Sequence, residues 1–254
     1  MVFEFCQGGN LQSSLRSQPG FWTADRKLKA CLDMCHAVAY LHSRRTMHRD
    51  IKCENFFVCH ENDNNEDIVI KLGDFGEACD FPSSASERLD ILGTVAYMAP
   101  ELIRGEKNYT HAVDTYALAM SLFEAWLGGV DAYPAQMSTF EIYEKVTKGD
   151  RPSFPQDMPP ALQQVILLAW APDAHMRPPV KDLGDILKEA MGELGGGAET
   201  GDEDGGEGED GGTHRFSLGS LLRRSVNYRK KTLEDLDSKA VENAENGWSQ
   251  RSEG

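Results

Sequence analysis

The sequence predicts a mainly α-helical domain with one small β-hairpin, and three observations support this fold class. Apolar residues recur at the three- and four-residue spacing of a helix between residues 23 and 43, and again in several segments from 112 to about 194. Two short β-like runs, 56–59 and 68–72, stand on either side of a polar turn. From residue 195 the sequence changes abruptly to glycine and acidic residues, so we expect the folded domain to end there.

The N-terminal part is expected to form a strand followed by two helices. Residues 1–5 are mostly apolar and lead into a glycine-containing connection, as a strand does before a tight turn. Residues 11–16 fit a short helix that a Pro-Gly pair ends. The next helix should begin near Thr23 or Asp25, because either side chain can accept a hydrogen bond from the first backbone amides.

The hairpin and a group of helices complete the domain. The hairpin places Asn55 and Asp74 at neighbouring strand ends. Segment 112–127 is apolar on nearly every face except at Asp114 and Glu124, which predicts a helix buried in the middle of a bundle. Further helices are expected between proline-containing connections, at 138–148, 160–170 and 180–191.

Composition and charge exclude several classes of function. The 254 residues are 40% apolar, which is enough for a sizeable core, and the net charge is −15. Residues 195–254 hold thirteen acids and eight bases, so about −10 remains on residues 1–194 and no nucleic-acid binding is expected. We also expect no membrane span, because no apolar run reaches roughly 18 residues, and no secretory signal.

The cysteines indicate the redox setting of the protein. No two of them form a C-x-x-C pair, and their spacing fits no zinc site. We therefore expect reduced thiols and an intracellular, cytoplasmic protein. The six residues are Cys6, Cys31, Cys35, Cys53, Cys59 and Cys79.

A polar loop at residues 48–55, His-Arg-Asp-Ile-Lys-Cys-Glu-Asn, has neither helical nor strand periodicity. Asp50 supplies a carboxylate that can take a proton, and Lys52 a cation that can neutralise a phosphate. Asn55 and Asp74 offer oxygen atoms to a hard divalent cation. The set suits phosphoryl transfer, although His-Arg-Asp or Asp-Phe-Gly alone would often be an ordinary charged turn.

The two triplets in this order, joined by a hairpin and followed by Ala99-Pro100-Glu101, resemble the catalytic loop and metal-binding triplet of the eukaryotic protein kinases. The resemblance covers residues 1 to about 190 and implies the helical C-terminal lobe of the kinase fold. It also implies ATP and Mg²⁺ as cofactors and protein hydroxyl groups as substrates. The roles that it implies are a base at Asp50, a γ-phosphate contact at Lys52 and metal ligands at Asn55 and Asp74.

The resemblance also implies a specificity. Lys52, together with Gly93-Thr94 ahead of the Ala-Pro-Glu triplet, looks like the serine/threonine-specific pattern. Residues 170–173, followed by Arg177 and a proline, are similar to the tyrosine-kinase-like group of serine/threonine kinases.

Several further residues have structural or regulatory roles by this resemblance. Asp114 matches an aspartate that braces the catalytic loop, and Arg177 matches the buried partner of Glu101. Arg49 stands where such kinases place an arginine that pairs with a phosphorylated loop, and modification of Thr94 or a nearby serine would order that loop. The alternative, that these serines only make the loop flexible, stays open. The serines are Ser83, Ser84 and Ser86, and the other members of the two triplets are His48, Phe75 and Gly76.

The first residues match the hinge that faces adenine. Phe3 takes the gatekeeper position, the Glu4 carbonyl and the Cys6 backbone face the base, and Phe57 forms the floor beneath it. For each phenylalanine taken alone, ordinary core packing remains the alternative.

The sequence departs from the family in one important respect. It contains no glycine-rich loop, no Val-Ala-Ile-Lys-like strand and no helix with the glutamate partner of that lysine, so we expect the N-terminal lobe to be almost entirely absent, through an incomplete gene model or truncation. Two hinge hydrogen bonds and half-burial of adenine supply about 4–5 kcal/mol before the cost of association. This chain alone should therefore bind ATP with a Kd of about 1 mM or weaker and be inactive.

We accordingly expect a kinase domain at 1–194, an acidic Gly-rich disordered linker at 195–212 and a mostly disordered tail at 213–254. The tail could form a short basic amphipathic helix that binds a partner or an anionic surface weakly. The expected function is ATP-dependent phosphoryl transfer to serine and threonine hydroxyls of proteins. The alternative is a non-catalytic, kinase-like module for protein interaction.

Overall fold

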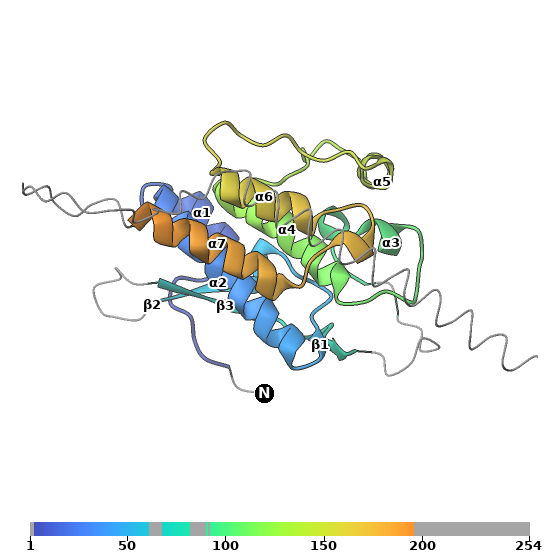
Figure 1. The fold of residues 1–254 in the computed structure, drawn as a ribbon, viewed down its shortest axis with the longest axis horizontal. Helices are drawn as coiled ribbons and strands as arrows, with labels where there is room; N and C mark the ends of the chain where they lie inside the picture. Colours follow the sequence, from blue (N-terminus) through green and yellow to red (C-terminus); the bar gives the residue numbers. More distant parts are fainter. Residues whose placement is uncertain (1–2, 61–67, 82–89, 91, 196–254) are drawn as a thin grey trace, which may run out of the picture. The chain divides into compact units, whose positions relative to one another are not determined.

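The computed structural model describes residues 3–60, 68–81, 90 and 92–195, and it is rich in helices (Figure 1). The α-helices are α1 (Leu11–Ser17), α2 (Ala24–Ser43), α3 (Pro100–Ile103), α4 (Ala112–Trp126), α5 (Thr139–Lys148), α6 (Pro160–Ala169) and α7 (Val180–Gly195). The strands are β1 (Thr46–Met47), β2 (Phe56–His60), β3 (Ile68–Leu72) and β4 (Cys79–Asp80), and single 3-10 turns span Cys53–Asn55, Val95–Tyr97 and Ala174–Met176. No helix within these described ranges is long and apolar enough to cross a membrane.

Helix α4 forms the centre of the core. All of its residues are buried, including Asp114 and Glu124. It packs against α2 and α6, and α7 packs against both of those helices (Figure 1). The prediction of a helix buried in the middle of a bundle is confirmed, and it rests on the apolar residues that occupy nearly every face of this helix.

The helix boundaries follow from side chains that cap exposed backbone amides. The Thr23 hydroxyl accepts a hydrogen bond from the Arg26 amide, so Thr23 is the cap of α2 and Asp25 lies in its first turn. At α5, Ser138 and Glu141 each accept from the other's backbone amide, which forms a capping box. Helix α7 runs to Gly195, four residues beyond the expected end, and residues 196–254, with most of the expected linker and the tail, lie outside the described part.

The predicted hairpin is present. Strands β2 and β3 are antiparallel, with paired residues from Phe56↔Leu72 to His60↔Ile68. Their connection, 61–67, lies outside the described residues. A second pair, β1 with β4, was not expected, because two-residue strands are too short to show alternation in a sequence.

The expected strand at residues 1–5 is wrong over the residues described. Phe3 to Phe5 have no regular structure. The chain instead pairs with β2 slightly later, where the Gly8 amide donates to the Val58 carbonyl at 2.9 Å and the Val58 amide donates to the Gly9 carbonyl at 2.9 Å. A Cβ atom on Gly8 would lie 2.7 Å from Val58 Cβ, so only glycine permits this approach.

The expectation that all cysteines are reduced is also wrong for one pair. Cys6 and Cys59 form a disulfide with their Cα atoms 4.5 Å apart. They are separated by 53 positions in sequence, so spacing alone could not reveal the pair. The pairing of the N-terminal segment with β2 brings them together. The remaining cysteines are free thiols, at Cys31, Cys35, Cys53 and Cys79.

Candidate active site

Asp50 lies at the centre of a hydrogen-bond network in the loop between β1 and β2. Lys52 Nζ donates to Asp50 Oδ2 at 2.7 Å, and the Thr94 hydroxyl donates to Oδ1 at 2.9 Å. Asn55 Nδ2 donates to the Asp50 carbonyl at 2.7 Å and to Oδ2 at 3.1 Å. Partial burial alone would raise the pKa of Asp50, but the hydrogen bonds from Lys52 and Thr94 outweigh it and hold the pKa below its usual value. The carboxylate is therefore ionised at neutral pH and able to orient a hydroxyl group.

The backbone of this loop is held by Asp114 from helix α4. The two carboxylate oxygens accept from the amides of His48 and Arg49, each at 2.8 Å. The His42 ring, at the end of α2, contacts the same carboxylate through Nε2 at 3.0 Å. Arg49 has a φ of 68°, in the left-handed region that a residue with a side chain rarely adopts. The brace from Asp114 supports this strained conformation.

The loop is also tied to the Asp-Phe-Gly triplet. His48 Nε2 contacts the Gly73 carbonyl at 2.9 Å, and the His48 ring lies 5.3 Å from the ring of Phe75. The Gly73 amide donates to the Asn55 carbonyl at 2.9 Å, which holds Asn55 and Asp74 at the same end of the hairpin. Asp74 is exposed and has a φ of 58°, so its backbone leaves the strand sharply.

Asn55 and Asp74 suit a magnesium ion in their donor chemistry. Both offer oxygen, the ligand that this hard cation prefers, and Mg²⁺ commonly takes only one or two protein ligands beside water and phosphate oxygens. Asn55 is buried, and its Nδ2 is committed to Asp50, so the orientation of its amide is fixed. Among the described residues, no three or more His, Cys, Asp or Glu side chains form a metal cluster, so a protein-only metal cage is not indicated there.

A cavity of about 500 Å³ lies beside this pair. It combines the four expected nucleotide residues with the expected metal ligand Asp74. Its lining includes Phe3, Glu4, Cys6, Phe57, Lys71 and Asp74. A pocket of this volume with mostly apolar walls is typical of a small-molecule site.

Two contacts shape the walls of this cavity. A Cβ atom on Gly73 would lie 2.8 Å from the ring of Phe57, so this glycine lets the aromatic floor sit against the backbone. Lys71 Nζ forms an exposed ion pair with both Glu4 oxygens, at 2.7 and 2.6 Å. Sequence reasoning missed Lys71, although its position on β3 beside the floor residue was a usable signal.

The expected regulatory residues have different surroundings in the structure. Thr94 faces the loop at residues 48–55, where its hydroxyl also accepts from Lys52 Nζ at 3.1 Å. Arg49 Nε donates to the Glu77 carbonyl at 2.6 Å, and Gly76 is exposed. The three candidate serines, Ser83, Ser84 and Ser86, lie outside the described residues.

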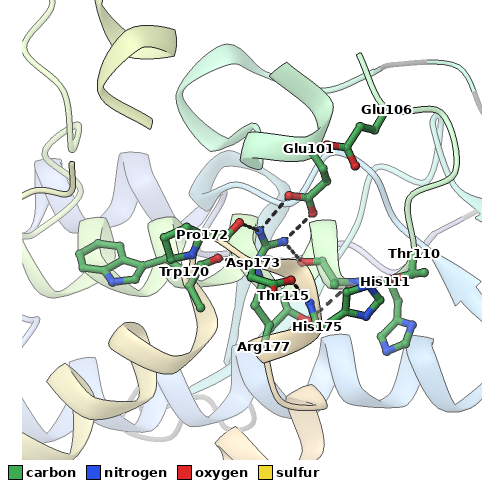
Figure 2. Close-up of polar contacts among 12 residues, drawn as sticks. Glu101, Glu106, Thr110, His111, Thr115, Trp170, Pro172, Asp173, His175 and Arg177 are labelled. Atoms are coloured by element: carbon green, nitrogen blue, oxygen red, sulfur yellow. Dashed lines mark hydrogen bonds and ion pairs between the residues drawn. The ribbon is translucent and has the colours of Figure 1, made fainter. Parts of the chain in front are cut away.

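Arg177 and Glu101 form a buried ion pair (Figure 2). The two guanidinium nitrogens donate to the two carboxylate oxygens at 2.6 and 2.8 Å. Arg177 also donates to the carbonyls of Ala112 and Ala171, at 2.9 and 2.8 Å. The pair thus joins α3, the start of α4 and the segment before α7.

A second buried network was not assigned from the sequence. The Tyr97 hydroxyl donates to Glu124 on α4, whose other oxygen accepts from the Ala132 amide at 2.9 Å. Burial raises the pKa of Glu124 to about 7, with smaller contributions from neighbouring acids. An acid in an otherwise apolar helix was visible as a signal, and so was the histidine in the last turn of α2 that contacts Asp114.

Comparison with known proteins agrees with this geometry. The family model described as protein tyrosine and serine/threonine kinase matches residues 1–187. The chain is 31% identical to serine/threonine/tyrosine-protein kinase HT1 of Arabidopsis thaliana, over 74% of this chain and 46% of that protein. It is 30% identical to serine/threonine-protein kinase STY46 of Arabidopsis thaliana, over 77% of this chain and 32% of that protein. It is 32% identical to proto-oncogene tyrosine-protein kinase ROS of Gallus gallus, over 70% of this chain and 8% of that protein.

The helical fold and the polar loop near the cavity fit the protein kinase class. The chain belongs to the protein tyrosine and serine/threonine kinase family. It spans less than half the length of each of the three relatives named above.

Proposed function

We propose that the chain carries the catalytic centre of an ATP- and Mg²⁺-dependent serine/threonine protein kinase. The observation that supports it best is the network at Asp50, whose ionised carboxylate lies between Lys52 and Thr94. Asp50 orients the substrate hydroxyl and accepts its proton as the new O–P bond forms and the bond to the leaving diphosphate breaks. Lys52 balances charge on the transferred phosphoryl group.

The remaining roles follow from the placement of the other residues. Asn55 and Asp74 would hold Mg²⁺, which supplies positive charge to the phosphate oxygens. The hinge residues Phe3, Glu4 and Cys6 would bind the base above Phe57. Of these residues, all except Asn55 line the same cavity, which supports assigning them to one site.

Serine/threonine specificity is the finer part of this proposal. Lys52, Thr94 and Asp50 contact one another, so the two positions that resemble the serine/threonine pattern act on the same carboxylate. The named relatives include serine/threonine and tyrosine kinases, so phosphoamino-acid analysis of the product is needed. We also propose the tyrosine-kinase-like group, an intracellular location where ATP is supplied, and a domain at 1–194.

We further propose that this chain alone binds ATP at about millimolar strength and is inactive. The described walls enclose the base from the hinge and floor only, and Phe3 and Phe5 remain 63% and 80% exposed. Two hydrogen bonds and partial burial leave little net free energy after the cost of association. The expected linker at 195–212 and the tail at 213–254 are proposed to lie outside the catalytic domain.

The decisive experiment compares this chain with the protein expressed from its full transcript. The full-length protein should transfer ³²P from ATP to a generic basic protein in the presence of Mg²⁺, and the products should be phosphoserine and phosphothreonine. Asp50→Asn should abolish transfer while leaving nucleotide binding intact. The matched control is Asp157→Asn, since Asp157 is exposed and distant in sequence from the site.

Each outcome has a defined meaning. Activity that survives Asp50→Asn would sink the base assignment, and phosphotyrosine as the sole product would overturn the specificity. A full-length protein that binds its partners but transfers no phosphate would favour the non-catalytic interaction module.

A further inference from the structure

The wall of the nucleotide cavity contains the disulfide between Cys6 and Cys59. Cys6 is half-buried and lines the cavity, whereas Cys59 is only 4% exposed and lies on β2. Their Cα atoms are 4.5 Å apart, which is within the range that a disulfide can span. The bond therefore connects the hinge side of the cavity to the strand that carries its floor, Phe57.

The contacts that hold the N-terminal segment to the domain become weaker toward the N-terminus. Backbone hydrogen bonds hold Gly8 and Gly9 to Val58, and Asn10 forms a bridge with Phe57. Among the described residues, the disulfide is the next covalent or hydrogen-bonded link to β2 toward the N-terminus.

Past the disulfide, the wall has weaker support. Phe3 and Phe5 are largely exposed, and Glu4 contacts Lys71 through an ion pair whose two side chains are 63% and 43% exposed. Exposed pairs of this kind hold a segment weakly because water and salt screen them. The position of residues 3–5 over the floor thus depends mainly on the Cys6–Cys59 bond.

We propose that Cys6 and Cys59 form a reversible dithiol–disulfide site, and that its oxidation fixes the cavity wall and strengthens nucleotide binding. The second half of this statement rests on the proposed function. A wall that is already in place spares the nucleotide the cost of ordering it, which raises affinity. By linkage, bound nucleotide in turn favours the disulfide over the two thiols.

The oxidant is a small-molecule disulfide such as glutathione disulfide. The more accessible Cys6 thiolate attacks one of its sulfurs, which forms a mixed disulfide and releases one glutathione thiolate. The Cys59 thiolate then attacks the Cys6 sulfur, which closes the protein disulfide and releases the second glutathione. Two protein thiols are oxidised, one glutathione disulfide is reduced to two thiols, and the two protons pass to solvent or to the released thiolates.

The test uses this chain equilibrated in buffers of glutathione and glutathione disulfide. Alkylation and peptide mapping should find a Cys6–Cys59 cross-link in the oxidised sample and two alkylated thiols in the reduced one. Amide hydrogen exchange of residues 3–9 should be at least threefold slower after oxidation. Titration with ATP and Mg²⁺ should give a Kd at least threefold lower in the oxidised sample.

Two variants make the result specific. Cys59→Ser should remove the redox response of both exchange and binding, because Cys6 then has no partner. Cys79→Ser should keep the full response, since Cys79 is a free thiol outside the cavity wall.

The outcomes separate this proposal from the proposed function. A peptide map without the Cys6–Cys59 cross-link in glutathione disulfide, or equal exchange rates in the two states, would overturn it. If neither state binds ATP while exchange still slows on oxidation, the thiol site stands, and both the nucleotide linkage and the proposed nucleotide binding fail. If ATP binds equally in both states, the proposed binding stands and the linkage fails.

Discussion

Replacement of Arg177 by alanine should remove a large part of the free energy of unfolding of the protein. The Arg177 side chain is fully buried and Glu101 is 5% exposed, so the variant leaves a buried carboxylate without its cation. Removal of one partner from such a pair costs roughly 3–5 kcal/mol. A domain of this size has a total stability on the order of 5–15 kcal/mol, so the loss is a large fraction of it.

The assay is equilibrium unfolding in urea followed by tryptophan fluorescence. With an m-value of about 2 kcal/mol/M, a loss of about 4 kcal/mol moves the midpoint about 2 M lower. The control is Arg104→Ala, which removes the same side chain from a pair with Glu106 in which both partners are about half exposed. Because water screens that pair, its loss should cost less than about 1 kcal/mol.

A double variant distinguishes charge from packing. Arg177→Met combined with Glu101→Leu removes both charges and keeps much of the volume, so it should be more stable than Arg177→Ala. A midpoint for Arg177→Ala within about 0.5 M of the wild type would refute the reasoning, since it would mean that the buried carboxylate finds another partner or takes a proton at little cost.

Three further predictions follow from the site and its supports. The pKa of Glu124 is about 7 in the folded protein against a usual 4.5, so between these values the folded state holds a proton that the unfolded state has lost, and stability should fall as pH rises through that window. Urea unfolding at pH 5 and pH 8 should show a loss of unfolding free energy on the order of 3 kcal/mol, and Glu124→Gln should abolish this loss. The same dependence of stability on pH in the variant would contradict the assignment. Gly8→Ala forces a Cβ against Val58 and should destabilise the protein by about 1–3 kcal/mol, whereas Gly20→Ala, which meets open space, should change it by less than about 1 kcal/mol in the same assay. Asp114→Asn replaces one acceptor oxygen by an NH₂ group that faces a backbone amide of the loop, which should cost about 1–3 kcal/mol of unfolding free energy. It should also lower kcat more than KM. A kcat equal to that of the wild type would show that the loop does not depend on this brace.

The elements that could be predicted from the sequence are those whose signal is contained within a few turns of chain. Helix α4 is apolar on nearly every face except at Asp114 and Glu124, and the β2–β3 hairpin shows two β-like runs with a polar turn between them. The loop around Asp50 carries polar residues at fixed spacing, and the structure places those side chains in contact, while their catalytic roles stay a prediction.

The features that could not be predicted depend on which distant segments meet. Residues 3–5 have the composition of a strand, but a strand also needs a partner with free backbone groups, and the chain pairs with β2 only from Gly8 onward. The bond between Cys6 and Cys59 depends on that same pairing. His42 reaches Asp114 because α2 packs against α4, and helix periodicity does not specify which side chains then come together.

The attachment of the loop at residues 48–55 to α4 has a consequence for how the protein opens. Amides bonded to a group in the most buried helix can exchange only when that helix separates from its neighbours, which is close to global unfolding. The amides of His48 and Arg49 are bonded to Asp114 in this way. Subglobal opening should therefore release residues 3–6 first and the loop at 48–55 among the last parts. The contacts around Asp50 should then persist in partly opened forms that have already lost the cavity wall at residues 3–6.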